Sequence, residues 1–320
     1  MKFLSVLLCL FFFQAQTFAQ CCSPGNPVGG TSNLGILDKK TLRLISFYRS
    51  SFSQGYLEGD KKSDYNFVKS GQFNYAGITL GYGLLNKITI ETELGYFINK
   101  TQNYNTQPTI TATGFGLNNA VFTVKYNLIN KTEKPFEWTI GAGGKFPFTR
   151  KFQMADNVEL PRDVQPSTNA FGIVAQSFLY KEFPENKLRL FFINRYEMNF
   201  PDIKNYKYGN ALYSSFFISH QIKQSNWAAI AQVRYEYRTK DITNANCNSC
   251  FANGISVSSS GGNLIFIAPQ INYTIAQKWN LSLLADFPVY RYYNGIQLGN
   301  KFAFALYLSR DFGKTKCITK

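Results

Sequence analysis

Apolar and polar residues alternate with a period of two along most of the chain. Every odd position of 279–289 is apolar, whereas the even positions include Asn280, Ser282 and Asp286. The stretch 88–96 shows the same pattern. Successive side chains of a strand point to opposite faces, so the pattern predicts strands with one apolar and one polar face. Such strands suit a wall between hydrocarbon and a wet lumen, although a soluble β-sandwich alternates in the same way.

Polar, turn-rich breaks divide the chain into about twelve candidate strands. Most are long enough to cross a bilayer when tilted. Their cores are 41–49, 72–84, 88–97, 117–129, 136–149, 170–182, 188–198, 210–222, 227–239, 263–275, 279–291 and 301–312.

The connections between these strands alternate between short and long. Outer-membrane barrels have short periplasmic turns and long outer loops, and an even strand number places both ends of the barrel in the periplasm. We therefore predict an all-β fold, a transmembrane antiparallel β-barrel of about 12 strands in the outer membrane of a Gram-negative cell.

The N-terminus resembles a secretory signal. Lys2 precedes an apolar run over 3–13, and Thr17 and Ala19 give a small-x-small exit. We expect a signal peptide at 1–20, a periplasmic segment or plug at 21–40, the barrel at 41–312 and a periplasmic tail at 313–320. Lipidation of Cys21 is an alternative, although the residues at 18–20 fit that signal poorly.

Composition agrees with a membrane wall. The net charge is +15, yet the sequence contains no lysine or arginine block and no nucleic-acid motif. The basic charge therefore favours anionic lipid headgroups over nucleic acid as a partner. Aromatic residues make up 17%, which is typical of girdles at the two membrane interfaces.

Parity assigns the inner face of the barrel. A charge facing lipid near the midplane costs about 2–4 kcal/mol, so apolar Ile88 and Ile90 are placed on lipid and the charges inside. Parity is less clear for 170–182 and 210–222. The polar interior is either a salt-bridge network that fills the barrel, which we favour, or a constriction that a solute passes. The predicted lumen-lining residues are Glu91, Glu93, Glu137, Lys145, Arg195, Glu197, Gln232, Arg234, Glu236, Arg238, Gln270 and Asp286.

Three prolines fall within candidate strands. Proline cannot donate to a β-ladder, so Pro147, Pro269 and Pro288 should mark bulges or breaks.

Five cysteines remain after signal removal, and an exported protein can oxidise them. Cys21 and Cys22 either form a disulfide with Cys317 or bind a soft metal such as Cu(I). Cys247 and Cys250 are expected to form a local loop disulfide.

Nothing in the sequence indicates an enzyme or a cofactor. His220 is the only histidine, and no serine is suitably placed beside it for a catalytic triad. No phosphate loop or dinucleotide fingerprint occurs.

Several blocks resemble a known family. They are Gly114-Phe115-Gly116, Val124-Lys125-Tyr126-Asn127-Leu128, Gly141-Ala142-Gly143-Gly144-Lys145-Phe146-Pro147, the loop 160–168, Ala268-Pro269-Gln270-Ile271, Phe287-Pro288-Val289-Tyr290 and Gly295-Ile296-Gln297-Leu298.

In this order, over about 72–312, the blocks resemble the meta-pathway phenol-degradation family of outer-membrane proteins, which is similar to long-chain fatty-acid transporters. Ser167 and Asn169 depart from the family's usual glycines. The resemblance implies a barrel that takes up apolar or aromatic small molecules, without fixing the substrate. In fatty-acid transporters strand breaks form lateral openings, so a side exit at the prolines is a hypothesis.

We therefore predict a porin-like barrel for passive transport of small apolar or aromatic molecules, with outer-membrane lipid and the solute as its partners. Tyr48, Phe52, Tyr56 and Tyr104 are expected to capture the solute. The alternative is a metal-handling or binding barrel that uses the N-terminal Cys-Cys segment.

Overall fold

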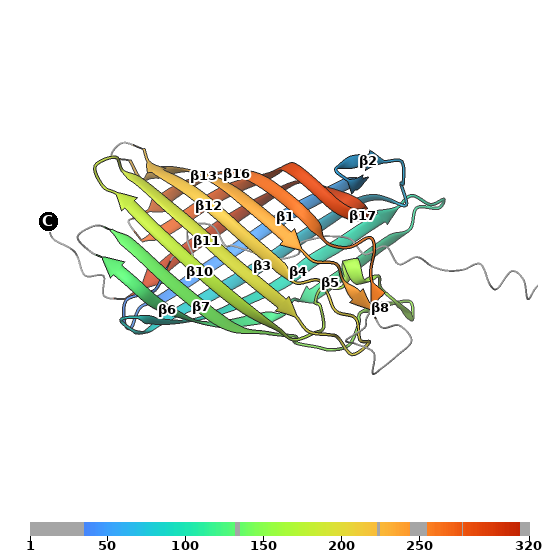
Figure 1. The fold of residues 1–320 in the computed structure, drawn as a ribbon, viewed down its shortest axis with the longest axis horizontal. Coiled ribbons are helices and arrows are strands. Elements are labelled where there is room, and N and C mark those ends of the chain that lie inside the picture. The colour runs from blue at the N-terminus through green and yellow to red at the C-terminus, as the bar shows by residue number, and fades with distance from the viewer. Residues whose placement is uncertain (1–34, 132–134, 223–224, 244–254, 277, 314–320) are drawn as a thin grey trace, which may run out of the picture.

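A computed structural model describes residues 35–131, 135–222, 225–243, 255–276 and 278–313. Its strands form a closed antiparallel β-barrel, because the last wall strand pairs with the first (Figure 1). In order around the wall the strands are β1 (Leu42–Gly59), β3 (Val68–Leu85), β4 (Ile88–Tyr104), β6 (Ala120–Lys131), β7 (Phe136–Phe146), β10 (Gly172–Phe183), β11 (Leu188–Asn199), β12 (Ala211–Gln221), β13 (Trp227–Arg238), β16 (Gly262–Ile275) and β17 (Trp279–Phe312).

The strand β17 crosses the wall twice. Its first half, from Trp279 to Tyr293, pairs with β16, and its second half, from Ile296 to Phe312, pairs with β1. The chain reverses at Asn294 and Gly295, where Gly295 has a φ of +64° that favours glycine. The described wall is therefore crossed twelve times, which confirms the predicted number.

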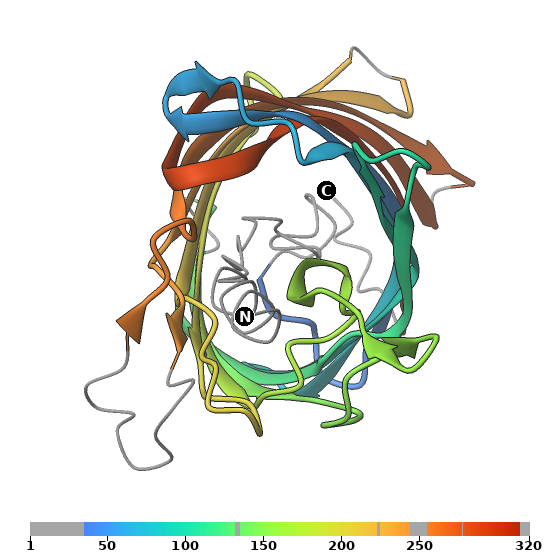
Figure 2. The ribbon, with the colours of Figure 1, turned by 90° about the vertical axis from the view of Figure 1, so that its right-hand side faces the viewer.

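The remaining elements lie in the long connections. They are β2 (Lys61–Ser63), β5 (Thr111–Leu117), the pair β8 (Met154–Ala155) and β9 (Val158–Glu159), the 3-10 helix η1 (Arg162–Val164), and the pair β14 (Ile242–Thr243) and β15 (Ile255–Ser256). Figure 1 shows these connections at one end of the barrel, and Figure 2 shows η1 within the ring of strands at that end. We call this the long-loop end and the opposite one the short-turn end. Among the described residues, none forms a helix long and apolar enough to span a membrane.

Both limits of the barrel lie at the short-turn end, as the even number of crossings requires. Leu42, the first residue of β1, is the ladder partner of Phe312, the last residue of β17. If the long loops face outward, as is usual for outer-membrane barrels, both limits face the periplasm.

Several strands are longer than the sequence predicted, among them β1 and β4. β1 continues to Gly59 and β4 to Tyr104, although alternation ends near residues 49 and 97. The ladders continue through register shifts, such as the one between Ser53 and Tyr56 beside Gly55 with φ +72°. A shift of one residue reverses the parity, so a strict period of two misses these extensions.

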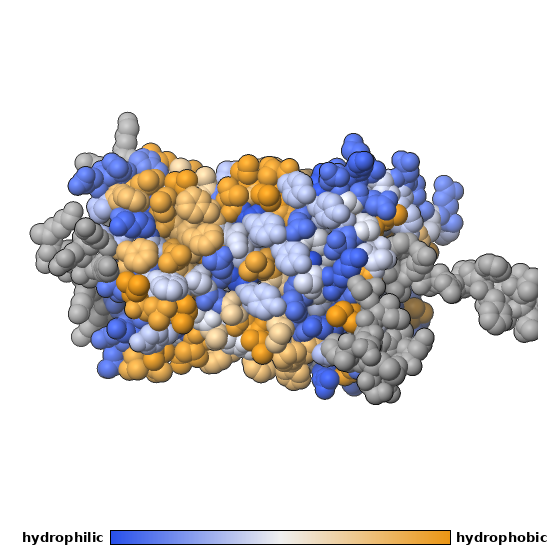
Figure 3. Space-filling view, viewed as in Figure 1, coloured by the Kyte–Doolittle hydropathy of each residue, from blue (hydrophilic) through white to orange (hydrophobic). Residues whose placement is uncertain are grey.

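The outer face of the wall is apolar. In β6, Phe122, Val124 and Tyr126 are each more than 40% exposed, whereas the intervening Thr123 and Lys125 are buried. Figure 3 shows apolar side chains over much of this face, mixed with hydrophilic ones in its middle, and mainly hydrophilic side chains at the long-loop end. This alternation is the one that a lipid-facing wall requires.

Ladder irregularities lie beside all three prolines. Pro147 directly follows the last residue of β7, although the sequence predicted a strand to residue 149. Pro288 pairs with Phe266 at a register shift. Pro269 pairs with Ala231 of β13, but on the β17 side the partners pass from Ile267–Phe287 to Gln270–Leu284. Proline's missing N–H explains a one-sided gap.

The lipid-facing wall gives a depth-dependent prediction. Val124→Arg, near the middle of β6, should lower the free energy of unfolding from liposomes by about 2–4 kcal/mol. Ile88→Arg, at the short-turn end of β4, is the matched control and should cost at most about 1 kcal/mol. Urea titration followed by tryptophan fluorescence measures both. Equal losses would contradict the assigned wall.

Candidate functional site

The inner face of the barrel carries two clusters of ion pairs. The first ion cluster comprises Glu91, Glu93, Lys125, Lys145, Arg195 and Glu197, from β4, β6, β7 and β11. Lys125 Nζ lies 2.7 Å from Glu91 Oε2. Arg195 joins two carboxylates, with Nη1 2.6 Å from Glu93 Oε1 and Nε 2.8 Å from Glu197 Oε1. Lys145 Nζ completes the cluster at 3.2 Å from Glu197 Oε2.

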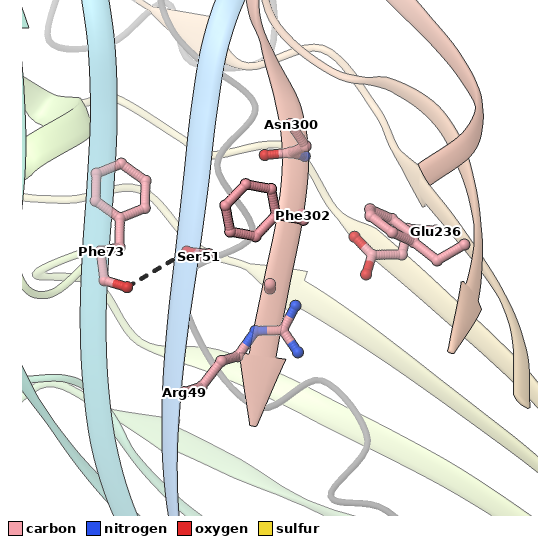
Figure 4. Close-up of a pocket in the computed structure, with 8 residues that line it drawn as sticks. Arg49, Ser51, Phe73, Glu236, Asn300 and Phe302 are labelled. Atoms are coloured by element: carbon pink, nitrogen blue, oxygen red, sulfur yellow. Dashed lines mark hydrogen bonds between the residues drawn. The ribbon is translucent and has the colours of Figure 1, made fainter. Parts of the chain in front are cut away.

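The second ion cluster comprises Arg49, Arg234, Glu236 and Asp286, from β1, β13 and β17. The Asp286 carboxylate is fully buried and lies 2.6 Å from Arg49 Nη1 and 2.9 Å from Arg234 Nη1. Arg234 Nε lies 2.7 Å from Glu236 Oε1. Figure 4 shows Arg49 and Glu236 pointing toward one another across a cavity of about 20 Å³ beside Phe302.

Each ion cluster is electrically balanced. The first has three cations and three carboxylates, and the second has two of each. Because every one of these charges already has a partner of opposite sign, neither cluster offers a spare charge to an ionic solute. The first cluster links β4, β6, β7 and β11, and the second links β1, β13 and β17.

The other predicted lumen residues are also placed on the inner face. Glu137 Oε1 accepts hydrogen bonds from Thr139 Oγ1 at 2.8 Å and from the Ile36 backbone N–H at 3.2 Å. Arg238 Nη2 donates to Tyr213 Oη at 3.3 Å. Gln232 and Gln270 are buried, at 1% and 5% exposure.

The described residues contain four buried apolar clusters, and the two largest are called patches here. The β10–β13 patch comprises Phe178, Phe191, Ile193, Phe217 and Ile230, all at most 5% exposed. The β1–β17 patch comprises Ile45, Phe47, Phe73, Tyr75, Phe97, Ala268, Leu284, Ala305 and Tyr307. These side chains give the lumen hydrocarbon surfaces between its charges.

Sequence reasoning missed these patches because it searched for polar residues on the inner face. The missed signal was the loss of alternation at 170–182 and 210–222. In β12, Phe216 is 40% exposed on the outer wall while Phe217 is fully buried inside. Two adjacent apolar residues hide the parity, so lost alternation itself marked an apolar inner face.

The segment before β1 enters the barrel at the short-turn end. Leu37 is 4% exposed, and its backbone N–H donates to Thr89 Oγ1 at 2.8 Å. A Cβ at Gly83 would lie 2.1 Å from the Asp38 carbonyl oxygen, so only glycine leaves room for this close approach. The segment from Gly35 to Thr41 therefore packs against the inner wall.

The long loops are held together by a buried polar network. Arg162 Nη1 lies 2.5 Å from Asp202 Oδ2, and its guanidinium lies 4.0 Å from the Tyr206 ring centroid. Asp241 accepts hydrogen bonds from Tyr206 Oη at 2.5 Å and from the Gly209 N–H at 2.7 Å. Burial raises the pKa of Asp241, against the lowering effect of those two bonds and of Arg238 and Arg162.

Two residues expected to capture solute do not face the lumen. Tyr48 is 42% exposed on the outer wall and donates to Asn74 Oδ1 at 2.9 Å. Phe52 packs against the exposed ring of Phe302. Their parity in β1 places both on lipid, so the capture role predicted for them is wrong. Tyr56 is buried, and Tyr104 packs edge-on against Phe67.

The candidate metal ligands and catalytic residues lie partly outside the described residues. Among them, no group of three or more His, Cys, Asp or Glu side chains is placed to hold a metal. Cys21, Cys22, Cys247, Cys250 and Cys317 lie outside the described residues, as does the predicted signal peptide. His220 is exposed at the short-turn end of β12, and Ser214 Oγ donates to Asn194 Oδ1 at 2.7 Å.

Comparison with solved structures gives the fold a precedent. The COG4313 outer membrane channel from Pseudomonas putida F1 matches with a TM-score of 0.67 at 11% identity, covering 88% of this chain and 98% of that chain. The two proteins share the fold, a closed antiparallel β-barrel. The apolar exterior of this barrel is the one that a wall facing lipid requires.

Two other channels match less closely. A mutant of the TodX monoaromatic hydrocarbon channel has a TM-score of 0.45 at 9% identity, covering 87% of this chain and 91% of that chain. A Pseudomonas aeruginosa FadL homologue has a TM-score of 0.42 at 8% identity, covering 86% and 91%. Neither a family model nor a curated protein matches the sequence.

The second ion cluster predicts a large stability loss. Asp286→Ala leaves Arg49 without its carboxylate in a buried site, so the free energy of unfolding should fall by about 3–5 kcal/mol. Glu182→Gln breaks the exposed pair with Arg189 and should cost at most about 1 kcal/mol. Denaturant titration of both variants in the same detergent tests the contrast. A similar small loss in both would contradict a desolvated cluster.

The loop network predicts a pH dependence. A raised pKa means that the folded loops favour protonated Asp241. The network should therefore be most stable below the ordinary pKa of an aspartate, about 3.9, and should weaken as pH rises through the raised value. Hydrogen-exchange protection of the Gly209 N–H, corrected for intrinsic rates, should fall from pH 4 to pH 7. In Asp241→Asn it should stay flat, and equal slopes would contradict the assignment.

Proposed function

We propose that this barrel mediates passive transport of small, uncharged, apolar or aromatic molecules across the outer membrane. The observation that carries the proposal is the pair of apolar patches inside a lumen whose ion clusters are internally balanced. An apolar solute gains by leaving water for the patches, whereas an ion would lose hydration without gaining a free counter-charge.

A cavity at the short-turn end connects the β10–β13 patch to an opening of the barrel. It measures about 580 Å³ and is lined by polar residues such as Asn272, Asn280 and Ser309, together with Phe191 and Ile230 of the β10–β13 patch. We call it the vestibule. A solute on that patch is thus adjacent to a polar opening from which it can leave.

The two ends of the lumen differ in what restricts them. At the long-loop end η1 lies inside the ring of strands, where Lys100 Nζ of β4 donates to the Gln165 carbonyl at 2.8 Å (Figure 2). At the short-turn end the segment from Gly35 to Thr41 occupies part of the lumen. We infer that the segment from Gly35 to Thr41 narrows this end, so that transport is slow and selective. The similarity to the P. putida channel supports transport over catalysis.

The metal-binding alternative depends on Cys21 and Cys22, which lie outside the described residues.

Uptake by intact cells tests the function. Expression of the barrel should raise the initial uptake rate of N-phenyl-1-naphthylamine in efflux-blocked Gram-negative cells. Phe217→Gln puts a polar group into the apolar patch and should remove most of that gain, roughly tenfold for about 1.5 kcal/mol of lost apolar contact. Phe216→Gln makes the same change on the outer wall and is the matched control.

Surface amounts and heat-modifiable migration of each variant confirm folding. An uptake rate equal to that of cells without the barrel would overturn the proposed function.

A further inference from the structure

A buried amide on the inner wall has no hydrogen-bond partner among the described residues. Gln270 is 5% exposed, and neither its Oε1 nor its Nε2 is hydrogen-bonded within the described part of the chain. Its neighbour Ile271 is 43% exposed on the outer wall, so strand alternation turns Gln270 toward the lumen. Buried amides are rarely left unpaired, because each lost hydrogen bond costs free energy.

Gln270 lies where the two apolar patches meet. In the β13–β16 ladder it is opposite Ile230 of the β10–β13 patch. In the β16–β17 ladder it is opposite Leu284 of the β1–β17 patch. A polar group with one donor and one acceptor function is therefore flanked on both sides by hydrocarbon.

A second amide in the next wall strand has spare capacity. Gln232 Nε2 donates to Ser215 Oγ at 3.0 Å, but its Oε1 has no partner within the described residues. Gln232 lies two residues beyond Ile230 in β13, so both point to the same face of the wall. It adds an acceptor to the donor and acceptor of Gln270.

The vestibule lies next to this place. Ile230, the ladder partner of Gln270, lines the vestibule, as does Asn272 two residues along β16. The carboxylate of Asp286 on neighbouring β17 is already paired with Arg49 and Arg234. The hydrogen-bonding capacity still open here is thus the neutral capacity of the amides.

We propose that Gln270, with Gln232 beside it, is the recognition point for the single polar group of an otherwise hydrocarbon solute. The solute is an uncharged aromatic or alicyclic molecule with a hydroxyl or carbonyl group. Its hydrocarbon body lies on Ile230 and Leu284, and its polar group pairs with the free amide. This inference rests on the proposed transport function and specifies its substrate class.

A matched pair of probes tests the inference. The full-length protein in detergent is dialysed to equilibrium against 1-naphthalenemethanol or 1-methylnaphthalene, with protein-free detergent at equal concentration to subtract micellar partitioning. One hydrogen bond to the amide should make the alcohol bind roughly three- to tenfold more tightly than the hydrocarbon.

Gln270→Leu should reduce the affinity for the alcohol to that for the hydrocarbon, while leaving hydrocarbon affinity unchanged or slightly higher. Gln72→Leu makes the same change at an exposed position of β3 and should keep the preference. The ratio in the unmodified protein needs no variant, so a variant that fails to fold does not remove the test.

The outcomes separate the two proposals. Equal binding of both probes, or a preference that survives in folded Gln270→Leu, overturns the role of Gln270 and leaves the transport proposal standing. An amide satisfied by water alone gives the equal-binding result. If neither probe binds the unmodified protein, the proposed function falls together with this inference.

Discussion

The hydrogen-bonding demand of the backbone in hydrocarbon is the constraint on which the rest of this structure depends. In a bilayer, each unpaired N–H or C=O costs several kcal/mol, so a β-wall has to close on itself. Pairing between β1 and β17 supplies that closure. Closure in turn imposes the alternation, because one face meets lipid and the other meets whatever the barrel encloses. The ion clusters, the apolar patches and the unpaired amides all lie on that enclosed face.

The enclosed face carries both charged clusters and apolar patches, and the two have different roles. Balanced ion clusters link strands that are far apart in sequence. A buried charge that loses its partner destabilises the fold strongly. Such clusters specify which strands are neighbours and in which register, even where their net contribution to stability is small. The apolar patches lie on other parts of the same wall. A lumen built in this way is polar enough to hold its shape and apolar enough to accept hydrocarbon.

Alternation made the wall predictable, and its loss made part of the interior unpredictable. The positions of the twelve crossings and the inward parity of Glu91, Lys145 and Arg234 followed from the cost of placing charge in lipid. The fusion of the last two predicted strands into β17 did not, because strand pairing continues through the predicted break at 292–300 up to a tight reversal at Gly295. The Gln270 amide lies on the face that parity assigns to the interior, but its lack of a partner within the described residues depends on tertiary neighbours that parity does not reveal.

The seam between the first and last strands has a consequence for biogenesis. Arg43 and Asp311 are 268 residues apart in sequence, yet their side chains meet across this seam at 2.7 Å. Contacts of such separation form late, since the intervening chain has to be ordered first. The nascent polypeptide therefore has an open, edge-exposing form until its final strand arrives. Until the barrel closes, its unpaired strand edges can therefore pair with other chains. This topology thus requires a factor that protects the polypeptide in the periplasm and covers the open edge during assembly.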